Sequence, residues 1–290
     1  MVNRLPEWFR QKIPGSDVYE KINQFKQMGI STVCQQARCP NQGDCFAHSR
    51  FTFLIMGNTC TRDCLFCGVK KAKRPSPLDM DEPERVSRAV EELDLDFVVI
   101  TSVSRDDLPD AGAGHFAKTI KLIRKNRGSQ TRIEVLIPDF SGNLSSLNVV
   151  LDAAADVVAH NLETVARLYP YLRPQADYRL CLHILARIKE IRPQVLTKSS
   201  LMLGLGENEE EVIKAMQDLL QSSCDILTLG QYLSPGRGYY PVAEFIAPEI
   251  FQKYREIARG LGFKSVLSEP LARSSFQAAE TYRSLTSCTT

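Results

Sequence analysis

The chain has 290 residues, enough for one α/β barrel domain or for two smaller domains. Hydrophobic residues make up 43% of it and charged residues 24%, which is the composition of a globular protein with a large core. The formal net charge of +2 gives no sign of a nucleic-acid-binding protein. The N-terminus lacks the apolar segment of a signal peptide, and no stretch approaches the roughly 18 apolar residues of a membrane span. We therefore expect a cytoplasmic protein with neither a nucleic acid nor a membrane as partner.

Residues 1–50 are irregular and are expected to form an extension that packs against the main domain. They contain Cys34, Cys39 and Cys45 in a C-x4-C-x5-C pattern. Because a cytosolic chain keeps its thiols reduced, these cysteines are better explained as metal ligands than as disulfide partners. Three thiolates are present and a fourth ligand is missing, so a structural zinc site and a chance grouping stay open as alternatives.

The strongest chemical signal is the segment CTRDCLFC, in which Cys60, Cys64 and Cys67 follow a predicted strand at residues 51–56. Three thiolates on one loop can bind three irons of a cubane [4Fe–4S] cluster and leave the fourth iron free for a cofactor. Zinc is the alternative, but zinc sites usually take four Cys or His ligands from paired knuckles, and His48 is the only histidine nearby. The spacing therefore favours an iron–sulfur cluster with an open iron.

The three remaining cysteines, Cys181, Cys224 and Cys288, stand alone in the sequence. A single cysteine in an apolar setting usually behaves as a small buried hydrophobic residue. We expect this of Cys181 and Cys224, whereas Cys288 lies close to the C-terminus.

From residue 51 onward, short apolar runs alternate with longer amphipathic segments. Alternating strands and helices of these lengths indicate repeated βαβ units around a parallel sheet, either an open doubly wound sheet or an incomplete barrel. Strands are predicted at 51–56, 97–102, 132–137, 157–161, 199–203 and 226–229. Helices are predicted at 82–93, 115–125, 143–153, 164–169, 176–191 and 209–221.

In both architectures, ligands bind at the carboxyl ends of the strands. The segment 105–107, Arg-Asp-Asp, follows the second predicted strand and either lines a substrate channel or caps the next helix. The glycines at 204 and 206 fit neither common phosphate-binding spacing. Polar or glycine-rich positions follow the strands at Thr101 and Ser102, Asp139, Asn161 and Glu163, 204–207, and Gln231.

Residues 266–290 form a second irregular extension, which contains Arg273-Ser274-Ser275. Taken without any resemblance, this tripeptide reads as a polar turn. A functional role for this tripeptide is considered only because the cysteine motifs precede it in the chain.

The successive motifs CQQARCPNQGDC and CTRDCLFC resemble those of the lipoyl synthase family of the radical SAM superfamily, whose cluster loop also has an aromatic residue, here Phe66, before the last cysteine. The resemblance implies an α/β fold, a partial (β/α)6 TIM-type barrel at 51–265, with an N-terminal extension at 1–50 and a C-terminal extension at 266–290. It covers nearly the whole chain, through VVITSVSRDDLPDAGAGHF, IEVLIPDF, HNLETV, LMLGLGE, LTLGQYL and ARSSF.

The resemblance implies two [4Fe–4S] clusters and S-adenosylmethionine (SAM) as cofactors. Cys60, Cys64 and Cys67 would hold the cluster whose open iron binds the amino and carboxylate groups of SAM. An electron from this cluster would cleave SAM to a 5′-deoxyadenosyl radical, which the protein must orient.

The resemblance also implies that Cys34, Cys39 and Cys45 hold an auxiliary cluster that is dismantled to supply sulfur. Its fourth ligand would be a serine of the Arg-Ser-Ser motif, and we favour Ser275 over Ser274. A serine oxygen is an unusual ligand for iron, and a weakly held iron suits a cluster that is broken during the reaction.

A SAM pocket needs polar groups for the ribose and the methionine end and an apolar surface for adenine. Asn161 and Glu163 are the candidates for the ribose or the methionine end. Arg179 could pair with the carboxylate through both its nitrogens, although a solvated helix face is its ordinary alternative. The segment 201–207 resembles the one that lies against adenine in the superfamily, where glycines permit close backbone approach. The implied cofactor-binding residues are Thr101, Asn161, Glu163, Arg179, Met202 and Glu207.

The implied activity is that of a sulfurtransferase. It inserts two sulfur atoms, at C6 and C8 of a protein-bound octanoyl-lysyl group, and uses two SAM molecules, one for each C–H bond. The implied partners are an octanoylated lipoyl carrier domain and an electron donor such as ferredoxin or flavodoxin. The carrier would be a 2-oxoacid dehydrogenase acyltransferase subunit or the glycine cleavage H protein. An apolar channel should lead the octanoyl chain between the two clusters.

The sequence departs from the common family pattern at four positions, none of which is an implied ligand. These departures weaken inferences about the substrate contacts around them but leave the reaction unchanged. A different two-cluster radical enzyme and a non-catalytic metal-binding scaffold are the competing hypotheses. The four positions are Phe276 in place of tyrosine, Ala159 in place of asparagine, Ser104 in place of aspartate and Ser200 in place of glycine.

Overall fold

The computed structural model describes residues 5–11 and 14–287. An eight-stranded sheet forms its centre, in the order β1-β2-β5-β6-β7-β8-β9-β10. All neighbouring strands are parallel except the pair β1–β2. The strands are β1 (Ser31–Thr32), β2 (Thr52–Ile55), β5 (Phe97–Ser102), β6 (Arg132–Leu136), β7 (Val157–Ala159), β8 (Leu196–Leu203), β9 (Ile226–Gln231) and β10 (Ser265–Ser268).

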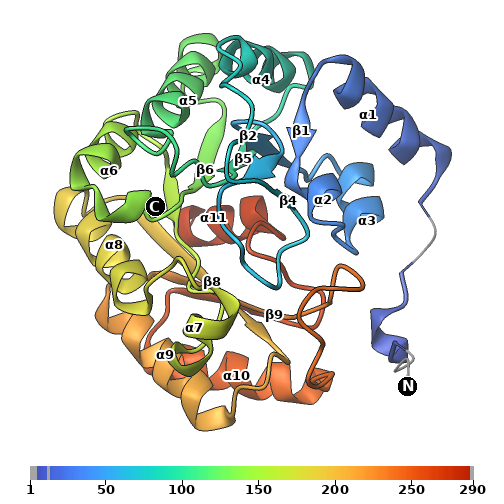
Figure 1. The fold of residues 1–290 in the computed structure, drawn as a ribbon, viewed down its shortest axis with the longest axis vertical. Helices are drawn as coiled ribbons and strands as arrows, with labels where there is room; N and C mark the ends of the chain where they lie inside the picture. The colour runs from blue at the N-terminus through green and yellow to red at the C-terminus, as the bar shows by residue number, and fades with distance from the viewer. Residues whose placement is uncertain (1–4, 12–13, 288–290) are drawn as a thin grey trace.

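Helices cover the outer side of this curved sheet, so that the molecule is an incomplete barrel (Figure 1). The predicted α/β class with a partial TIM-type barrel is therefore confirmed, and all six predicted strands lie in the sheet. The outer helices are α4 (Glu82–Glu92), α5 (Ala113–Arg127), α6 (Leu144–Leu151), α8 (Tyr178–Ile191), α9 (Glu209–Gln221) and α10 (Pro248–Leu261).

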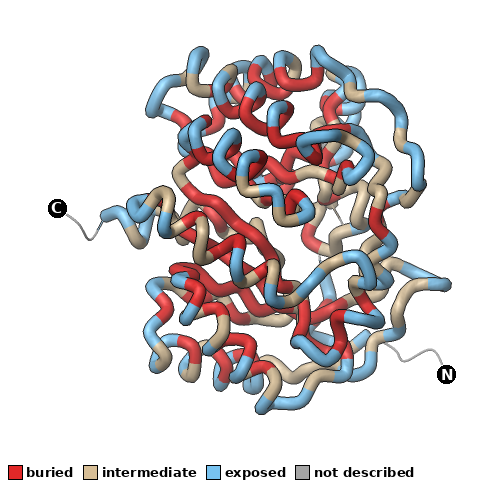
Figure 2. Tube along the Cα trace, turned by 60° about the vertical axis from the view of Figure 1, so that its left-hand side comes forward, coloured by how far each residue is buried: buried red, intermediate tan, exposed pale blue. Residues whose placement is uncertain are grey.

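Local sequence signals explain where these helices start and stop. At the start of α9, the Asn208 side chain accepts a hydrogen bond from the backbone N–H of Glu211. The Glu211 carboxylate accepts one from the backbone N–H of Asn208, and the two bonds together form a capping box. Pro248 begins α10, and Gly262 ends it with a φ of 114°. The strands are buried almost throughout, as expected of parallel strands covered on both faces (Figure 2).

The helix predicted at 164–169 is wrong. The chain bends at Thr164, is extended at Val165, and then forms a 3-10 turn, η3 (Ala166–Leu168), and one short helix, α7 (Tyr169–Leu172). Glu163 has a φ of 68°, which turns the chain across the end of β7 before a helix can begin. The predicted segment has only six residues, and apolar spacing over so few positions does not distinguish a helix from a turn.

The N-terminal segment consists of η1 (Glu7–Phe9), α1 (Ser16–Gln27), α2 (Val33–Gln36) and α3 (Gln42–Ala47). It is attached to the barrel by an aromatic cluster, in which the rings of Phe25 and Phe51 are 4.5 Å apart and Phe46 and Phe53 are their neighbours. Such clusters add to the apolar area that holds the segment in place. The cysteines of α2 and α3 are thereby held beside β2.

The C-terminal segment is more regular than expected. The boundary expected after residue 265 falls inside β10, which pairs with β9 in the central sheet, so a division after Ser268 follows the fold better. The last helix, α11 (Ala278–Thr286), lies at the amino end of β5, where Tyr282 contacts Phe97 and Arg283 pairs with Asp96. It therefore closes the barrel end opposite to the carboxyl ends of the strands.

Among the described residues, no helix is long and apolar enough to cross a membrane.

Candidate functional site

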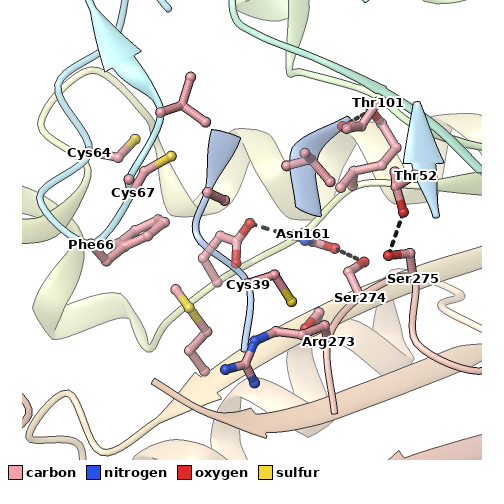
Figure 3. Close-up of a pocket in the computed structure, with 18 of the residues that line it drawn as sticks. Cys39, Thr52, Cys64, Phe66, Cys67, Thr101, Asn161, Arg273, Ser274 and Ser275 are labelled. Carbon is pink, nitrogen blue, oxygen red and sulfur yellow. Dashed lines mark hydrogen bonds between the residues drawn. The ribbon is translucent and has the colours of Figure 1, made fainter. Parts of the chain in front are cut away.

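A cavity of about 420 Å³ opens at the carboxyl ends of the strands (Figure 3). Five of the six cysteines of the two motifs line it, and so do Ser274 and Ser275. Cys64 and Cys67 lie on one side of the cavity, and Ser275 and Thr52 lie on the other. Segments more than 200 residues apart in the chain therefore meet here, as the positions after the strands led us to expect.

The first cysteine set lies on the loop between β2 and α4, which also contains β3 (Thr59–Cys60) and β4 (Lys70–Lys71). The Cys60 sulfur accepts hydrogen bonds from the backbone N–H groups of Arg62 at 3.4 Å and Ser104 at 3.3 Å. Burial raises the pKa of the Cys67 thiol to about 12, and the charges of Cys64 and Cys60 act in the same direction. The three sulfurs are therefore close enough to repel one another as thiolates.

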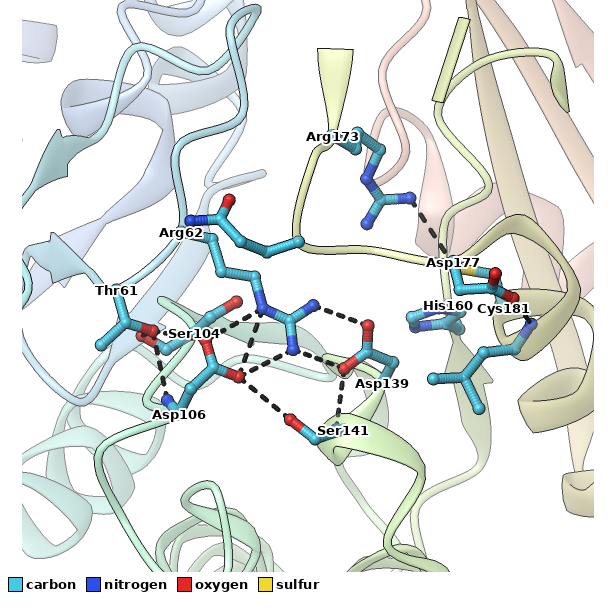
Figure 4. A network of polar contacts seen from close by, with 12 residues as sticks. Thr61, Arg62, Ser104, Asp106, Asp139, Ser141, His160, Arg173, Asp177 and Cys181 are labelled. Carbon is cyan, nitrogen blue, oxygen red and sulfur yellow. Dashed lines mark hydrogen bonds and ion pairs between the residues drawn. The ribbon is translucent and has the colours of Figure 1, made fainter. Parts of the chain in front are cut away.

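Arg62, inside the cluster loop, is buried in a network of carboxylates (Figure 4). Its two terminal nitrogens each donate to Asp139 at 2.6 Å, and Nε and Nη2 donate to Asp106. Asp106 also accepts from the Thr61 hydroxyl at 2.6 Å. The network ties the loop to the ends of β5 and β6, so Asp106 neither caps α5 nor needs to line a channel.

We expect Asp139→Ala to lower the free energy of unfolding by about 2–3 kcal/mol, because it removes charged hydrogen bonds from the buried Arg62 while Asp106 still neutralises part of its charge. Urea unfolding followed by circular dichroism measures the effect. Asp152→Ala is the matched control, since Asp152 pairs with Arg192 on the exposed surface. Its effect should stay within about 0.5 kcal/mol.

The stability lost in Asp139→Ala should depend on pH. Burial opposes ionisation of Asp139, but Arg62 outweighs it and holds the pKa of this carboxyl below its usual range. A depressed pKa in the folded state gives stability that is complete above the unfolded value near about 4 and is lost as the pH falls. The difference between wild type and Asp139→Ala should therefore shrink on acidification; a difference independent of pH contradicts the ion-pair explanation.

The second cysteine set lies in the N-terminal segment, with Cys34 on α2, Cys45 on α3 and Cys39 between them. Burial and then the charge of Cys39 raise the pKa of the Cys34 thiol to about 11. Burial, Cys34 and Cys39 likewise raise the pKa of Cys45 to about 12. Cys34 and Cys39 line the cavity, whereas Cys45 is buried and does not line it. These three sulfurs also form one group.

The two serines of the Arg-Ser-Ser motif have different partners. Ser275 Oγ accepts a hydrogen bond from the Thr52 hydroxyl at 2.8 Å, and the backbone of Thr52 also donates to the Cys34 sulfur. Ser274 Oγ instead donates to Asn161 Oδ1 at 2.9 Å. Only Ser275 therefore shares a neighbour with the second cysteine set.

Both cysteine sets fit a cubane cluster in the chemistry of their donors. Thiols with raised pKa values become stable thiolates only when a cation compensates their charge. Within the described parts of the chain, no three Cys, His, Asp or Glu side chains are gathered tightly enough to hold a single metal ion. A cubane makes a different demand, because each cysteine binds a different iron and the sulfurs surround the cluster.

Four of the six residues implied in cofactor binding line the cavity: Thr101, Asn161, Glu163 and Met202. Asn161 Nδ2 donates to Glu163 Oε1 at 3.0 Å. Burial raises the pKa of Glu163, although Arg173 and Asn161 act against it. These four side chains therefore share one cavity with the cysteines of both sets.

Arg179 is the first correction. Its side chain is exposed on the first turn of α8 and lies outside the cavity, so the solvated-face alternative was right. Arg173 lines the cavity instead and donates to the carbonyl oxygens of Asn161 and Leu162. No local sequence signal could have found it, because the short helix α7 that precedes it was not predicted.

Glu207 is the second correction, because its carboxylate accepts hydrogen bonds from the backbone N–H groups of Gly204 and Leu205 and lies outside the cavity. The glycine at 204 has a φ of 89°, and a Cβ there would lie 2.3 Å from the carbonyl oxygen of Glu244. The close backbone approach is thus made to another part of the protein rather than to adenine.

Cys181 is buried as expected but also belongs to a polar cluster (Figure 4). Arg173 Nη1 lies 3.8 Å from its sulfur, and His160 and Tyr169 are further neighbours. Although burial opposes it, the charge of His160 lowers the pKa of Cys181. Cys224 is buried among apolar residues as predicted, and Cys288 lies outside the described residues.

The sequence pattern of the radical SAM superfamily matches residues 54–219 of the chain. The chain is 51% identical to a lipoyl synthase of Caldanaerobacter subterraneus subsp. tengcongensis, over 96% of this chain and 97% of that protein. It is 50% identical to a lipoyl synthase of Caldicellulosiruptor bescii, over 95% of this chain and 94% of that protein.

Two solved structures illustrate the similarity in fold. Methylornithine synthase (PylB) matches with a TM-score of 0.54 and 14% identity, over 74% of this chain and 70% of that chain. Streptococcus suis SuiB bound to S-adenosylmethionine matches with a TM-score of 0.59 and 11% identity, over 92% of this chain and 59% of that chain. At these identities the similarity concerns the fold alone.

Proposed function

The chain belongs to the lipoyl synthase family of the radical SAM superfamily, and from this we propose how its cavity serves that activity. The activity is that of a radical SAM sulfurtransferase that inserts sulfur at C6 and C8 of a protein-bound octanoyl-lysyl group. SAM and a [4Fe–4S] cluster are its cofactors. We propose that a second, auxiliary [4Fe–4S] cluster supplies the sulfur.

The observation that carries this proposal is the meeting of both cysteine sets at one cavity. Apolar side chains from four strands, Leu54, Val99, Leu136 and Leu201, line the same cavity. An octanoyl chain has only apolar surface to offer beyond its carbonyl group, so such walls suit it. The arrangement supports a substrate chain that lies between the two clusters.

We assign Cys60, Cys64 and Cys67 to the SAM-binding cluster. When bound, this cluster and SAM together supply the organic radical that an unactivated C–H bond requires. The chain's own task is to hold and orient SAM. Its contacts are proposed to come from Asn161 and Glu163, and from Thr101, Met202 and Arg173.

Arg173 replaces Arg179 as the proposed partner of the SAM carboxylate. Arg173 lines the cavity, where its positive charge interacts with the Cys64 sulfur and with the Glu163 carboxylate. A planar guanidinium binds a carboxylate through two parallel hydrogen bonds. Hydrogen bonds to backbone carbonyls hold Arg173 in place before any ligand arrives.

We assign Cys34, Cys39 and Cys45 to the auxiliary cluster, with Ser275 as its fourth ligand. The proposed units are the N-terminal segment, the barrel and a C-terminal segment that carries this serine. The proposed partners are the octanoylated acyltransferase subunit of a 2-oxoacid dehydrogenase or the glycine cleavage H protein, with ferredoxin or flavodoxin as electron donor. A cytoplasmic location is proposed because reducing compartments keep such cysteines available as ligands.

Two measurements test the proposal. An octanoylated carrier peptide, incubated with SAM and a reductant, should yield the lipoylated peptide by mass spectrometry. Iron and sulfide analysis of the anaerobically prepared protein should give about eight irons per chain, from two [4Fe–4S] clusters. Stoichiometric zinc in place of iron would refute the assignment of both cysteine sets.

Ser275→Ala should leave the SAM-binding cluster intact and lower both auxiliary iron content and lipoyl product. The physical reason is the loss of the only oxygen ligand on that side, next to Thr52 and Cys34. Iron analysis and product formation measure it. Ser275→Cys should hold the iron more firmly and slow product formation, since thiolates suit iron–sulfur chemistry.

Ser274→Ala is the matched control, because Ser274 is adjacent in sequence but donates to Asn161. Its auxiliary iron content should equal that of the wild type. A defect of Ser274→Ala without one of Ser275→Ala would move the ligand by one residue. If neither variant loses iron, the segment has only a structural role.

A further inference from the structure

Arg273 is a cation that faces the cavity without an acidic partner (Figure 3). Its hydrogen bond is made by Nη1 to the carbonyl oxygen of Ala272 at 2.7 Å. In the described part of the chain, no carboxylate forms an ion pair with it, whereas the buried Arg62 has two carboxylates. Arg273 is half-buried, and a charge that is partly removed from water without a partner is unfavourable. The fold therefore leaves a place for an anion beside Arg273.

The backbone holds Arg273 firmly in this position. A Cβ atom on Gly230 of β9 would lie 2.0 Å from the Ala272 carbonyl oxygen and 3.4 Å from Arg273 Nη1. Only a glycine at 230 lets the 272–273 segment pack directly on the strand. The guanidinium is consequently placed by the central sheet rather than by a loose tail.

The charged neighbour of Arg273 belongs to the second cysteine set. The charge of the Cys39 thiolate favours the charged form of Arg273, and the two side chains lie beside one another in Figure 3. Two residues further along the chain, Ser275 reaches the Thr52 that also contacts Cys34. Arg273 and Ser275 thus approach the same cysteine set from one short segment.

We propose that Arg273 is the counter-charge of the auxiliary cluster and keeps this anionic group bound inside the barrel. The inference rests on the proposed auxiliary cluster. A cluster held by three thiolates and one serine oxygen is anionic, because its ligands carry more negative charge than the core carries positive charge. The guanidinium of Arg273, half-buried at the cavity wall, offsets that charge, and net charge sets both the retention and the reduction potential of such clusters.

The other arginines at the cavity have different roles. Arg173 lies beside Cys64 of the first set and is held by carbonyl oxygens. Arg38 also lines the cavity but is exposed, and it donates to the carbonyl oxygen of Pro235. Water screens an exposed charge far more than a buried one. Arg38 is therefore the matched control for Arg273, next to the same cysteine in sequence.

The test uses the full chain carrying Cys60→Ala, Cys64→Ala and Cys67→Ala, so that only the auxiliary cluster is observed. In this background, Arg273→Met should lower the midpoint potential of the cluster, since an added electron loses its nearby cation. It should also speed up iron loss to a chelator about tenfold, which corresponds to about 1.4 kcal/mol of lost charge pairing. Arg273→Lys and Arg38→Met should behave like the parent.

Arg273→Gln keeps a donor for the Ala272 carbonyl and tests the same loss of charge if Arg273→Met does not fold. An unchanged potential and rate of iron loss in both neutral variants overturns the proposal. So does a loss of SAM affinity with the auxiliary cluster unaffected, measured for Arg273→Met in the chain that keeps Cys60, Cys64 and Cys67, because Arg273 would then serve the SAM carboxylate. If the triple-alanine parent binds no iron at all, the auxiliary cluster itself is refuted, and that failure is distinguishable from the others.

Discussion

Replacing Cys60, Cys64 or Cys67 by alanine is expected to reduce reductive cleavage of SAM to background. In the proposed assignment each of these cysteines supplies one of only three thiolates to the cluster, and no further cysteine lines that side of the cavity among the described residues. With two thiolates left, the cluster has two unprotected irons and does not assemble stably. The measurement is 5′-deoxyadenosine formation by liquid chromatography, with SAM and an excess of reductant.

Cys224→Ala is the control for this prediction, because Cys224 is buried outside the cavity and its sulfur donates only to the Ile226 carbonyl oxygen. Its cleavage rate should match that of the wild type. Undiminished 5′-deoxyadenosine formation in any one of the three motif variants would refute the assignment of this set.

Replacing Cys34, Cys39 or Cys45 by alanine is expected to abolish the lipoyl product while SAM cleavage stays measurable. The two cysteine sets belong to separate segments, so the loss of one leaves the loop of the other anchored through Arg62, Asp106 and Asp139. What is lost is the sulfur donor rather than the radical source. The experiment follows 5′-deoxyadenosine and lipoyl peptide in the same reaction mixture.

The ratio of these two products is the informative quantity. Wild-type protein should give both, the Cys34 set should give 5′-deoxyadenosine alone, and the Cys60 set should give neither. Lipoyl peptide formed by a variant whose auxiliary cluster is verifiably absent would mean that the sulfur comes from elsewhere.

The central sheet could be predicted from the sequence because parallel strands carry a strong local signal. Continuous apolar runs such as β5 at Phe97–Ser102 were located to the residue, and Glu209–Gln221 was predicted with its helix bounds. Both elements are long and strongly patterned. β10 and α10 were not predicted: no element was assigned to 248–261 inside the expected barrel, and most of β10 fell in the extension expected at 266–290.

Some of the residues that line the cavity could be predicted, because ligands bind at the carboxyl ends of parallel strands. Thr101, Asn161 and Glu163 lie at or just after the ends of predicted strands and line the cavity, whereas Glu207 also follows a predicted strand but does not line it. Arg179 does not, because a helix has one face toward the core and one toward solvent, and spacing alone did not tell which face this arginine occupies. Arg173 was overlooked because nothing local distinguishes it.

The sequence by itself determined the chemistry of this protein, since the spacing of its cysteines specifies how many thiolates each loop offers and therefore where iron can bind. Only the tertiary structure decided which distant groups serve that chemistry. Ser275 meets Thr52 across 223 positions of chain, Arg62 meets Asp139 across 77, and Arg273 is left without a carboxylate beside Cys39. The physical reason is that a thiolate's affinity for iron belongs to the residue, whereas the neighbours, charge and burial that tune it arise only when the barrel brings separate segments together.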